Sequence, residues 1–118
     1  MNNLRVGIAG FGIVGKRRNE ILQKLDGVEV IAVCDKDPSQ LIGLDSKITH
    51  YNDHLNLFKE NLDILFVCLT NNIAADVTKD ALQHGLHVFC EKPPGMNMGD
   101  IESVIEVEKL SPSLKLMY

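Results

Sequence analysis

The chain has 118 residues, with 12 basic and 16 acidic side chains and a formal net charge of -4. This length suits a single domain, and a hydrophobic content of 45% is enough to form a buried core. The acidic balance excludes the basic surface that nucleic-acid-binding proteins carry, so no nucleic-acid partner is expected. A membrane partner is not expected either, because no apolar run approaches the ~20 residues needed to span a bilayer.

Apolar runs alternate with segments of helical spacing along the chain. The runs predict strands at residues 4–9, 28–34, 48–51, 62–69, 87–90 and 114–118. The segments between them predict helices at residues 13–25, 37–43, 53–61, 73–84 and 100–108. One apolar stripe of the first helix is expected to face the sheet, formed by Val14, Ile21, Leu22 and Leu25. This alternation predicts an α/β fold with a doubly wound parallel sheet, the most apolar run (62–69) at its centre, and one domain over residues 1–118.

The stretch from Val6 to Gly15 passes from the first strand into the first helix with the spacing G-x-G-x-x-G. Gly10 permits a tight turn, Gly12 lets a pyrophosphate approach the backbone, and Gly15 lets the helix pack closely on the strand. The free N–H groups and the dipole at the helix start favour phosphate charge. The spacing therefore predicts a dinucleotide site, with a structural turn or another nucleotide-like ligand as the alternative. The cofactor-binding residues expected here are Gly10, Phe11, Gly12, Ile13, Val14 and Gly15.

An acidic residue, Asp35, ends the next apolar run and lies 20 positions after Gly15. A carboxylate there accepts hydrogen bonds from a ribose diol and repels a 2′-phosphate. NAD is therefore the expected cofactor, with NADP less favoured. Lys36 follows directly and is expected to line the same site.

Polar residues also follow two later strands, and ligands of a parallel sheet bind outside the carboxyl ends of its strands. A polar loop, Thr70–Asn72, is expected after the strand 62–69, and Glu91–Pro93 follows the strand 87–90. Both are expected to converge with the glycine loop and Asp35 on one edge of the sheet. These segments add the candidate site residues Leu69, Thr70, Asn71, Asn72, Glu91, Lys92 and Pro93.

The cysteines Cys34, Cys68 and Cys90 lie inside or at the end of apolar runs that are expected to be buried. No C-x-x-C spacing is present, so neither a metal site nor a disulfide framework is expected. Three reduced thiols are typical of a cytoplasmic protein.

These motifs together resemble the N-terminal domain, a Rossmann fold, of the Gfo/Idh/MocA oxidoreductases. The matching segments are Gly-Phe-Gly-Ile-Val-Gly at 10–15, Cys-Asp-Lys-Asp-Pro at 34–38, Leu-Asp-Ile-Leu-Phe-Val-Cys at 62–68 and Gly-Leu-His-Val-Phe-Cys-Glu-Lys-Pro at 85–93. The last segment is the most specific, because few other domains with the glycine loop have Glu-Lys-Pro after this strand. It also argues against a weaker alternative, an S-adenosylmethionine-binding domain.

The resemblance implies NAD or NADP across the strand ends, and hydride transfer at the CH–OH group of a sugar, cyclitol or related polyol. It implies that Lys92 is catalytic and reaches the nicotinamide and the reacting hydroxyl, where an ammonium stabilises developing negative charge. The alternative for Lys92 is a surface lysine in a proline turn. Glu91 is expected beside the nicotinamide, and the Lys92–Pro93 bond is one that can be cis at modest cost.

Two departures from the family pattern stand out. The family loop Thr-Pro-Asn-x-x-His has Thr70 here in place of the proline and Ala74 in place of the histidine. The family's second, mostly antiparallel domain, which binds substrate and supplies a catalytic histidine, is expected to be absent, and the four histidines of this chain are not expected to replace it. The chain is therefore expected to bind the dinucleotide, to meet a sugar-like substrate only with the missing domain, and to be inactive alone. A stand-alone, non-catalytic NAD-binding module that works with a partner is the alternative, and the sheet face that would meet the second domain leaves room for a homo-oligomer.

Overall fold

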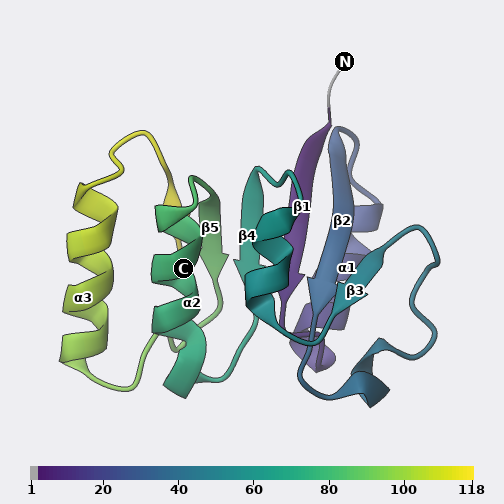
Figure 1. Cartoon of the computed structure of the whole chain (residues 1–118), viewed down its shortest axis with the longest axis horizontal. Coiled ribbons are helices and arrows are strands. Elements are labelled where there is room, and N and C mark those ends of the chain that lie inside the picture. The colour runs from purple at the N-terminus through teal and green to yellow at the C-terminus, as the bar shows by residue number, and fades with distance from the viewer. Residues whose placement is uncertain (1–2) are drawn as a thin grey trace.

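The computed structural model describes residues 3–118, and the first two residues of the expected domain, Met1 and Asn2, lie outside the described part. Within it, a 6-stranded parallel sheet has the order β3-β2-β1-β4-β5-β6 (Figure 1). The strands are β1 (Leu4–Ala9), β2 (Val28–Cys34), β3 (Thr49–Tyr51), β4 (Ile64–Val67), β5 (His87–Cys90) and β6 (Leu116–Met117). The helices are α1 (Ile13–Gln23), α2 (Asn71–Gln83) and α3 (Met98–Lys109), with the 3₁₀ helices η1 (Pro38–Leu41) and η2 (His54–Lys59). The predicted doubly wound sheet is confirmed, and β4 lies inside it as expected.

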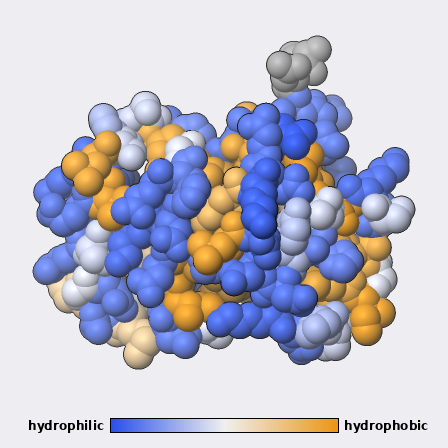
Figure 2. All heavy atoms as spheres, in the orientation of Figure 1, coloured by the Kyte–Doolittle hydropathy of each residue, from blue (hydrophilic) through white to orange (hydrophobic). Residues whose placement is uncertain are grey.

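The side chains of the central strand β4 alternate between two apolar layers. Leu65 and Val67 are fully buried in the layer shared with α2, α3 and η2. Ile64 and Phe66 belong to the opposite layer, which α1 and η1 cover. Figure 1 shows α2 and α3 in front of the sheet and α1 behind it, and Figure 2 shows that the outer surfaces of α2 and α3 are largely hydrophilic.

The expected apolar stripe of α1 is wrong in three of its four positions. Val14, Ile21 and Leu25 are 40%, 47% and 51% exposed, and only Leu22, at 7%, lies in the core. The helix approaches the sheet so closely at Gly15 that a single row, Gly15 and Leu22, meets it. Val14 and Ile21 lie on a flank of α1 beside which no helix of residues 3–118 packs, and Leu25 lies beyond the end of the helix at Gln23.

Next to α1, the described part of the chain covers one sheet face only partly. Phe66 of β4 and Phe89 of β5 project from this face and stack with ring centroids 5.1 Å apart. Met117 of β6 pairs with Phe89 and is 62% exposed. The predicted exposure of a sheet face is therefore present, next to α1.

Several boundaries differ from the sequence prediction for local reasons. The helix expected at residues 53–61 is the 3₁₀ helix η2, and Asp53 caps it by accepting a hydrogen bond from the Leu55 amide at 2.9 Å. The polar loop expected at Thr70–Asn72 is also wrong, because Thr70 takes the N-cap position. The amides of Ile73 and Ala74 both donate to the Thr70 carbonyl at 3.1 Å, so α2 begins two residues earlier than predicted.

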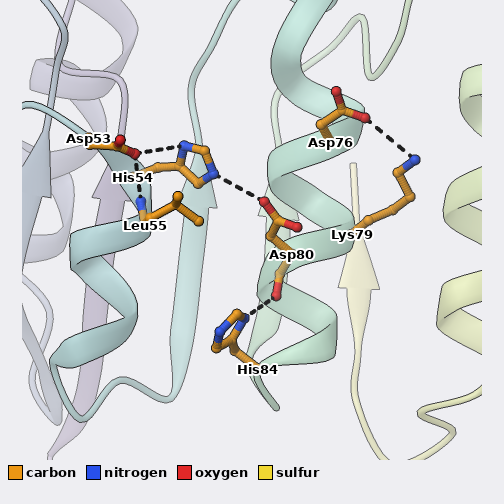
Figure 3. A network of polar contacts seen from close by, with 7 residues as sticks. All are labelled: Asp53, His54, Leu55, Asp76, Lys79, Asp80 and His84. Carbon is orange, nitrogen blue, oxygen red and sulfur yellow. Dashed lines mark hydrogen bonds and ion pairs between the residues drawn. The ribbon is translucent and has the colours of Figure 1, made fainter.

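Two histidines, His54 and His84, serve as structural links (Figure 3). His54 of η2 donates to the Asp80 carboxylate of α2 at 3.1 Å, and its other ring nitrogen lies 3.5 Å from Asp53. His84 donates to the Asp80 carbonyl at 2.7 Å and stacks on Phe58 with centroids 4.1 Å apart. These contacts fasten η2 to α2 on the face of the sheet opposite to α1.

The three cysteines are free thiols. Burial raises the pKa of Cys34 to about 11 and the pKa of Cys68 to about 12, and burial also raises the pKa of Cys90. Thiols of this kind favour the folded state only while they stay protonated.

We expect the free energy of unfolding to fall as the pH rises above 9. A raised folded-state pKa gives stability that is fully present below the unfolded value of 9.0 and is lost between that value and the folded one. At pH 10 the loss is about 1 kcal/mol for each of Cys34 and Cys68. Urea denaturation under reducing conditions at pH 8, 9 and 10 measures it. Cys34→Ala and Cys68→Ala variants should each show a shallower decline, and an unchanged decline in both would contradict the assignment.

Within residues 3–118, no helix has the length and apolar character that crossing a membrane requires. The same residues contain no group of three or more His, Cys, Asp or Glu side chains placed to hold a metal ion.

Candidate functional site

The glycine loop lies at the carboxyl end of β1, between the ends of β2 and β4. The Gly10 amide donates to the Cys34 carbonyl at 2.9 Å, and the Cys68 amide donates to the Ala9 carbonyl at 2.8 Å. Gly10 has a φ of 93°, which side-chain-bearing residues rarely adopt, and a Cβ there would lie 2.4 Å from the Cys68 carbonyl oxygen. The turn predicted at Gly10 is therefore set by its backbone and by the neighbouring strand.

The other two glycines of the loop have opposite surroundings. A Cβ on Gly15 would lie 2.0 Å from the Gly10 carbonyl oxygen, whereas a Cβ on Gly12 would meet nothing within 4 Å. Gly12 is the N-cap of α1, no side chain caps this helix, and no acidic residue occupies its first turn. The start of α1 is thus an open site where backbone N–H groups face solvent, the arrangement that binds anions.

Asp35 is held rigidly at the end of β2. One carboxylate oxygen accepts from the Phe11 amide and the other from the Asp37 amide, each at 2.8 Å. Its own carbonyl accepts from the Asn52 side chain at 3.1 Å. The carboxylate therefore joins the glycine loop to the end of β2 and keeps a fixed orientation, with further lone pairs left to accept from a ligand.

A pocket of about 270 Å³ opens beside this carboxylate. Its lining comes from the ends of β1, β2 and β4 and from the first turn of α2, and consists of Gly10, Gly12, Asp35, Lys36, Cys68, Leu69, Thr70 and Ile73. Three of the four segments expected to converge contribute to this lining, and the segment Glu91–Pro93 does not. Cys68 and Ile73 were missed, and their positions directly before and after the predicted segment Leu69–Asn72 are the signal that would have found them.

The remaining candidate residues do not line this pocket. Phe11 and Gly15 are buried beneath the glycine loop. Ile13 and Val14 lie in the exposed first turn of α1, and Asn71 and Asn72 lie in the first turn of α2 instead of in a loop. The last three candidate residues, Glu91, Lys92 and Pro93, lie on the loop that directly follows β5.

This loop is anchored at its start and open at its tip. The Glu91 amide donates to the Val67 carbonyl at 2.9 Å, which continues the pairing of β5 with β4. The Glu91 side chain forms an ion pair with Arg18 of α1. Lys92 and Pro93 are exposed, and the peptide bond between them is cis. An exposed ammonium with no ion pair among residues 3–118 is available to an incoming group.

A parallel sheet in this strand order, with a glycine loop leading into α1 and an acidic residue at the end of β2, defines the class of Rossmann dinucleotide-binding domains. Residues 4–114 match the model of a family described as an oxidoreductase family with an NAD-binding Rossmann fold. The chain belongs to this family, the Gfo/Idh/MocA oxidoreductases, which confirms the resemblance seen in the motifs.

Several known proteins that are similar to this chain are inositol dehydrogenases. Inositol 2-dehydrogenase from Salmonella paratyphi B is 32% identical over 112 residues, which are 90% of this chain and 33% of that enzyme. The crystal structure of myo-inositol 2-dehydrogenase from Lactobacillus plantarum superposes with a TM-score of 0.89 at 28% identity, over 98% of this chain and 36% of that one. Scyllo-inositol dehydrogenase from Lactobacillus casei, solved with NAD(H) and scyllo-inositol, shares the fold with a TM-score of 0.88 at 23% identity. The chain spans about a third of the length of the curated relatives that it matches.

Proposed function

We propose that this chain is the NAD-binding part of a dehydrogenase that oxidises the CH–OH group of a cyclitol, sugar or related polyol. The observation that carries the proposal is the fixed Asp35 carboxylate beside the open Gly12 backbone in one pocket. The two features match the two ends of an adenosine diphosphate, since one suits a ribose diol and the other a pyrophosphate. The inositol dehydrogenases similar to this chain supply the substrate class.

The residues around the pocket would divide the dinucleotide between them. Gly10, Gly12 and the first amides of α1, those of Ile13 and Val14, would hold the pyrophosphate. Asp35 and Lys36 would hold the adenosine ribose. The part of the cofactor that leads to the nicotinamide would contact Leu69, Thr70, Asn71 and Asn72. When bound, NAD accepts the hydride.

Lys92 would be the residue of this chain that contacts the reacting group of the substrate. Its exposed ammonium lies on the loop after β5, next to Glu91 and the cis bond to Pro93. There it would hydrogen-bond to the reacting oxygen and stabilise the charge that develops on it. Substrate recognition would come from a second domain beyond residues 1–118, because the relatives of this chain are about three times its length.

Asp35 also predicts the choice of cofactor. Its two oxygens are held by the Phe11 and Asp37 amides, so a 2′-phosphate would meet a fixed negative charge. We expect NAD to bind this chain more tightly than NADP. Asp35→Ala should lower the affinity for NAD by about tenfold, the value of one charge-assisted hydrogen bond, and should change NADP affinity less.

Isothermal titration calorimetry of the purified chain with NAD and with NADP tests this proposal. The ratio of the NAD and NADP affinities distinguishes a specific effect from partial unfolding, because a partly unfolded variant loses affinity for both cofactors. Asp26→Ala is the matched control, since it removes the same charge from an exposed turn at the other end of the sheet. An unmodified chain that binds neither dinucleotide would contradict the proposed function, and equal losses in Asp35→Ala would contradict the role of Asp35.

A further inference from the structure

The basic run Lys16-Arg17-Arg18 sends its three cations to three different places. Lys16 donates to the Gln40 side chain at 2.5 Å and lies over the Phe11 ring, on the η1 side of α1. Arg17 is exposed to solvent. Arg18 points the other way, across the sheet, to the strand end that carries Glu91 and Lys92.

The contact made by Arg18 has several parts. Its Nε donates to the Glu91 carboxylate, and its guanidinium carbon lies 5.6 Å from the centre of the Phe89 ring. The two charged side chains are only 33% and 22% exposed. The hydrogen bond to Glu91 raises the pKa of Arg18 above its usual value, so the guanidinium stays charged. Partial burial and the aromatic platform distinguish this pair from the i,i+3 pairs on the surfaces of α2 and α3.

The pair connects two segments that are 73 residues apart in the sequence. At one end, Arg18 lies a single helical turn after Gly15, whose close contact with Gly10 fixes the start of α1. At the other end, Glu91 is bonded to β4 through its amide and is followed directly by Lys92. Strand β4 lies between them, so no backbone hydrogen bond joins α1 to this loop.

We propose that Arg18 is a positioning residue that sets the distance between the pyrophosphate-binding start of α1 and the loop carrying Lys92. This proposal rests on the proposed function, because it assigns the two tethered segments to the two halves of one dinucleotide. The pair holds Glu91 in place, and through it the backbone of Lys92, so that a cofactor anchored at Gly12 reaches the lysine loop in a fixed register. Positioning of this kind matters because small displacements of a reacting group are costly.

The test compares two ligands that share the adenosine, pyrophosphate and second ribose but differ in the nicotinamide. NAD and ADP-ribose are titrated by calorimetry against the unmodified chain, Arg18→Ala, Arg18→Lys and Arg17→Ala. Arg18→Ala should lower NAD affinity by about fivefold or more and leave ADP-ribose affinity within about twofold. Arg18→Lys, which keeps the charge but loses the Nε donor, should fall between the two. Arg17→Ala removes an equal charge from the neighbouring residue and should change neither affinity.

A double variant identifies the route of the effect. If Arg18 acts through Glu91, adding Arg18→Ala to a Glu91→Ala chain should cause no further loss of NAD affinity. Equal losses for NAD and ADP-ribose, or an Arg18→Ala loss that persists in the Glu91→Ala chain, would overturn the positioning role and leave the proposed function standing. Binding of neither ligand to the unmodified chain would overturn both.

Discussion

Replacing Gly15 by alanine should lower the free energy of unfolding by at least ~3 kcal/mol, the upper range for overpacking a rigid site. The added Cβ would lie 2.0 Å from the Gly10 carbonyl oxygen and 3.0 Å from the Gly10 carbonyl carbon. Both are backbone atoms of the loop, and the Gly10 amide is bonded to β2, so neither can move aside alone. Helix α1 would have to lift from the sheet and give up the burial of Leu22.

Urea denaturation followed by far-UV circular dichroism measures this loss, because the chain has no tryptophan to report unfolding by fluorescence. Gly12→Ala is the matched control. It adds the same methyl group to the same loop, where the backbone has a φ of −75° and no atom lies within 4 Å of the new Cβ. Its unfolding midpoint should stay close to that of the parent chain. A Gly15→Ala midpoint equal to that of the parent would show that α1 does not approach the loop this closely.

The same Gly12→Ala variant should lose dinucleotide affinity by about 100-fold, or ~3 kcal/mol, while remaining folded. The reason is the reverse of the one at Gly15: the space above Gly12 is open in the chain and is the space that we assign to the pyrophosphate. A methyl group there would hold the phosphates away from the first amides of α1, where short hydrogen bonds and the helix dipole act together.

Calorimetric titration with NAD measures this loss, and Gly99→Ala provides the control. Gly99 lies in the first turn of α3, where an added Cβ meets only the Asn97 side chain, at 3.2 Å. That variant should bind NAD as the parent does. Unchanged NAD affinity in Gly12→Ala would mean that the pyrophosphate does not approach the glycine loop, even if the chain binds NAD elsewhere.

Features that depend on residues near one another in the sequence were predictable. Apolar runs gave the strands because a parallel sheet covered on both faces requires continuous apolar sequence. The glycine spacing predicted the turn at Gly10 and the close approach at Gly15, since each glycine meets a backbone constraint. Asp53 at the start of η2 and Gly85 after the end of α2 are local signals of the same kind, through a capping carboxylate and a φ of 81°.

Features that depend on which surfaces meet were not predictable. Periodicity placed Val14, Ile21 and Leu25 on one side of α1, but it could not show that a different row of the helix touches the sheet. Nothing in the basic run Lys16-Arg17-Arg18 indicates that Arg18 reaches a residue 73 positions away. The carboxylate of Asp35 was predicted, but its two backbone donors depend on how the glycine loop folds over the end of β2.

The position of β1 has a consequence for how the chain folds as it is synthesised. Strand β1 comes before the other strands of the sheet in the sequence but lies inside the sheet, and one of its two neighbours, β4, pairs Val6 with Ile64 and Ala9 with Val67. During translation β1 can pair with β2 early, but its other edge stays open until about 60 further residues have left the ribosome. Contacts between residues so far apart close slowly, and an open apolar strand edge is prone to mispairing. The growing chain therefore passes through a half-built sheet, and the arrival of β4 is the step that pairs the second edge of β1.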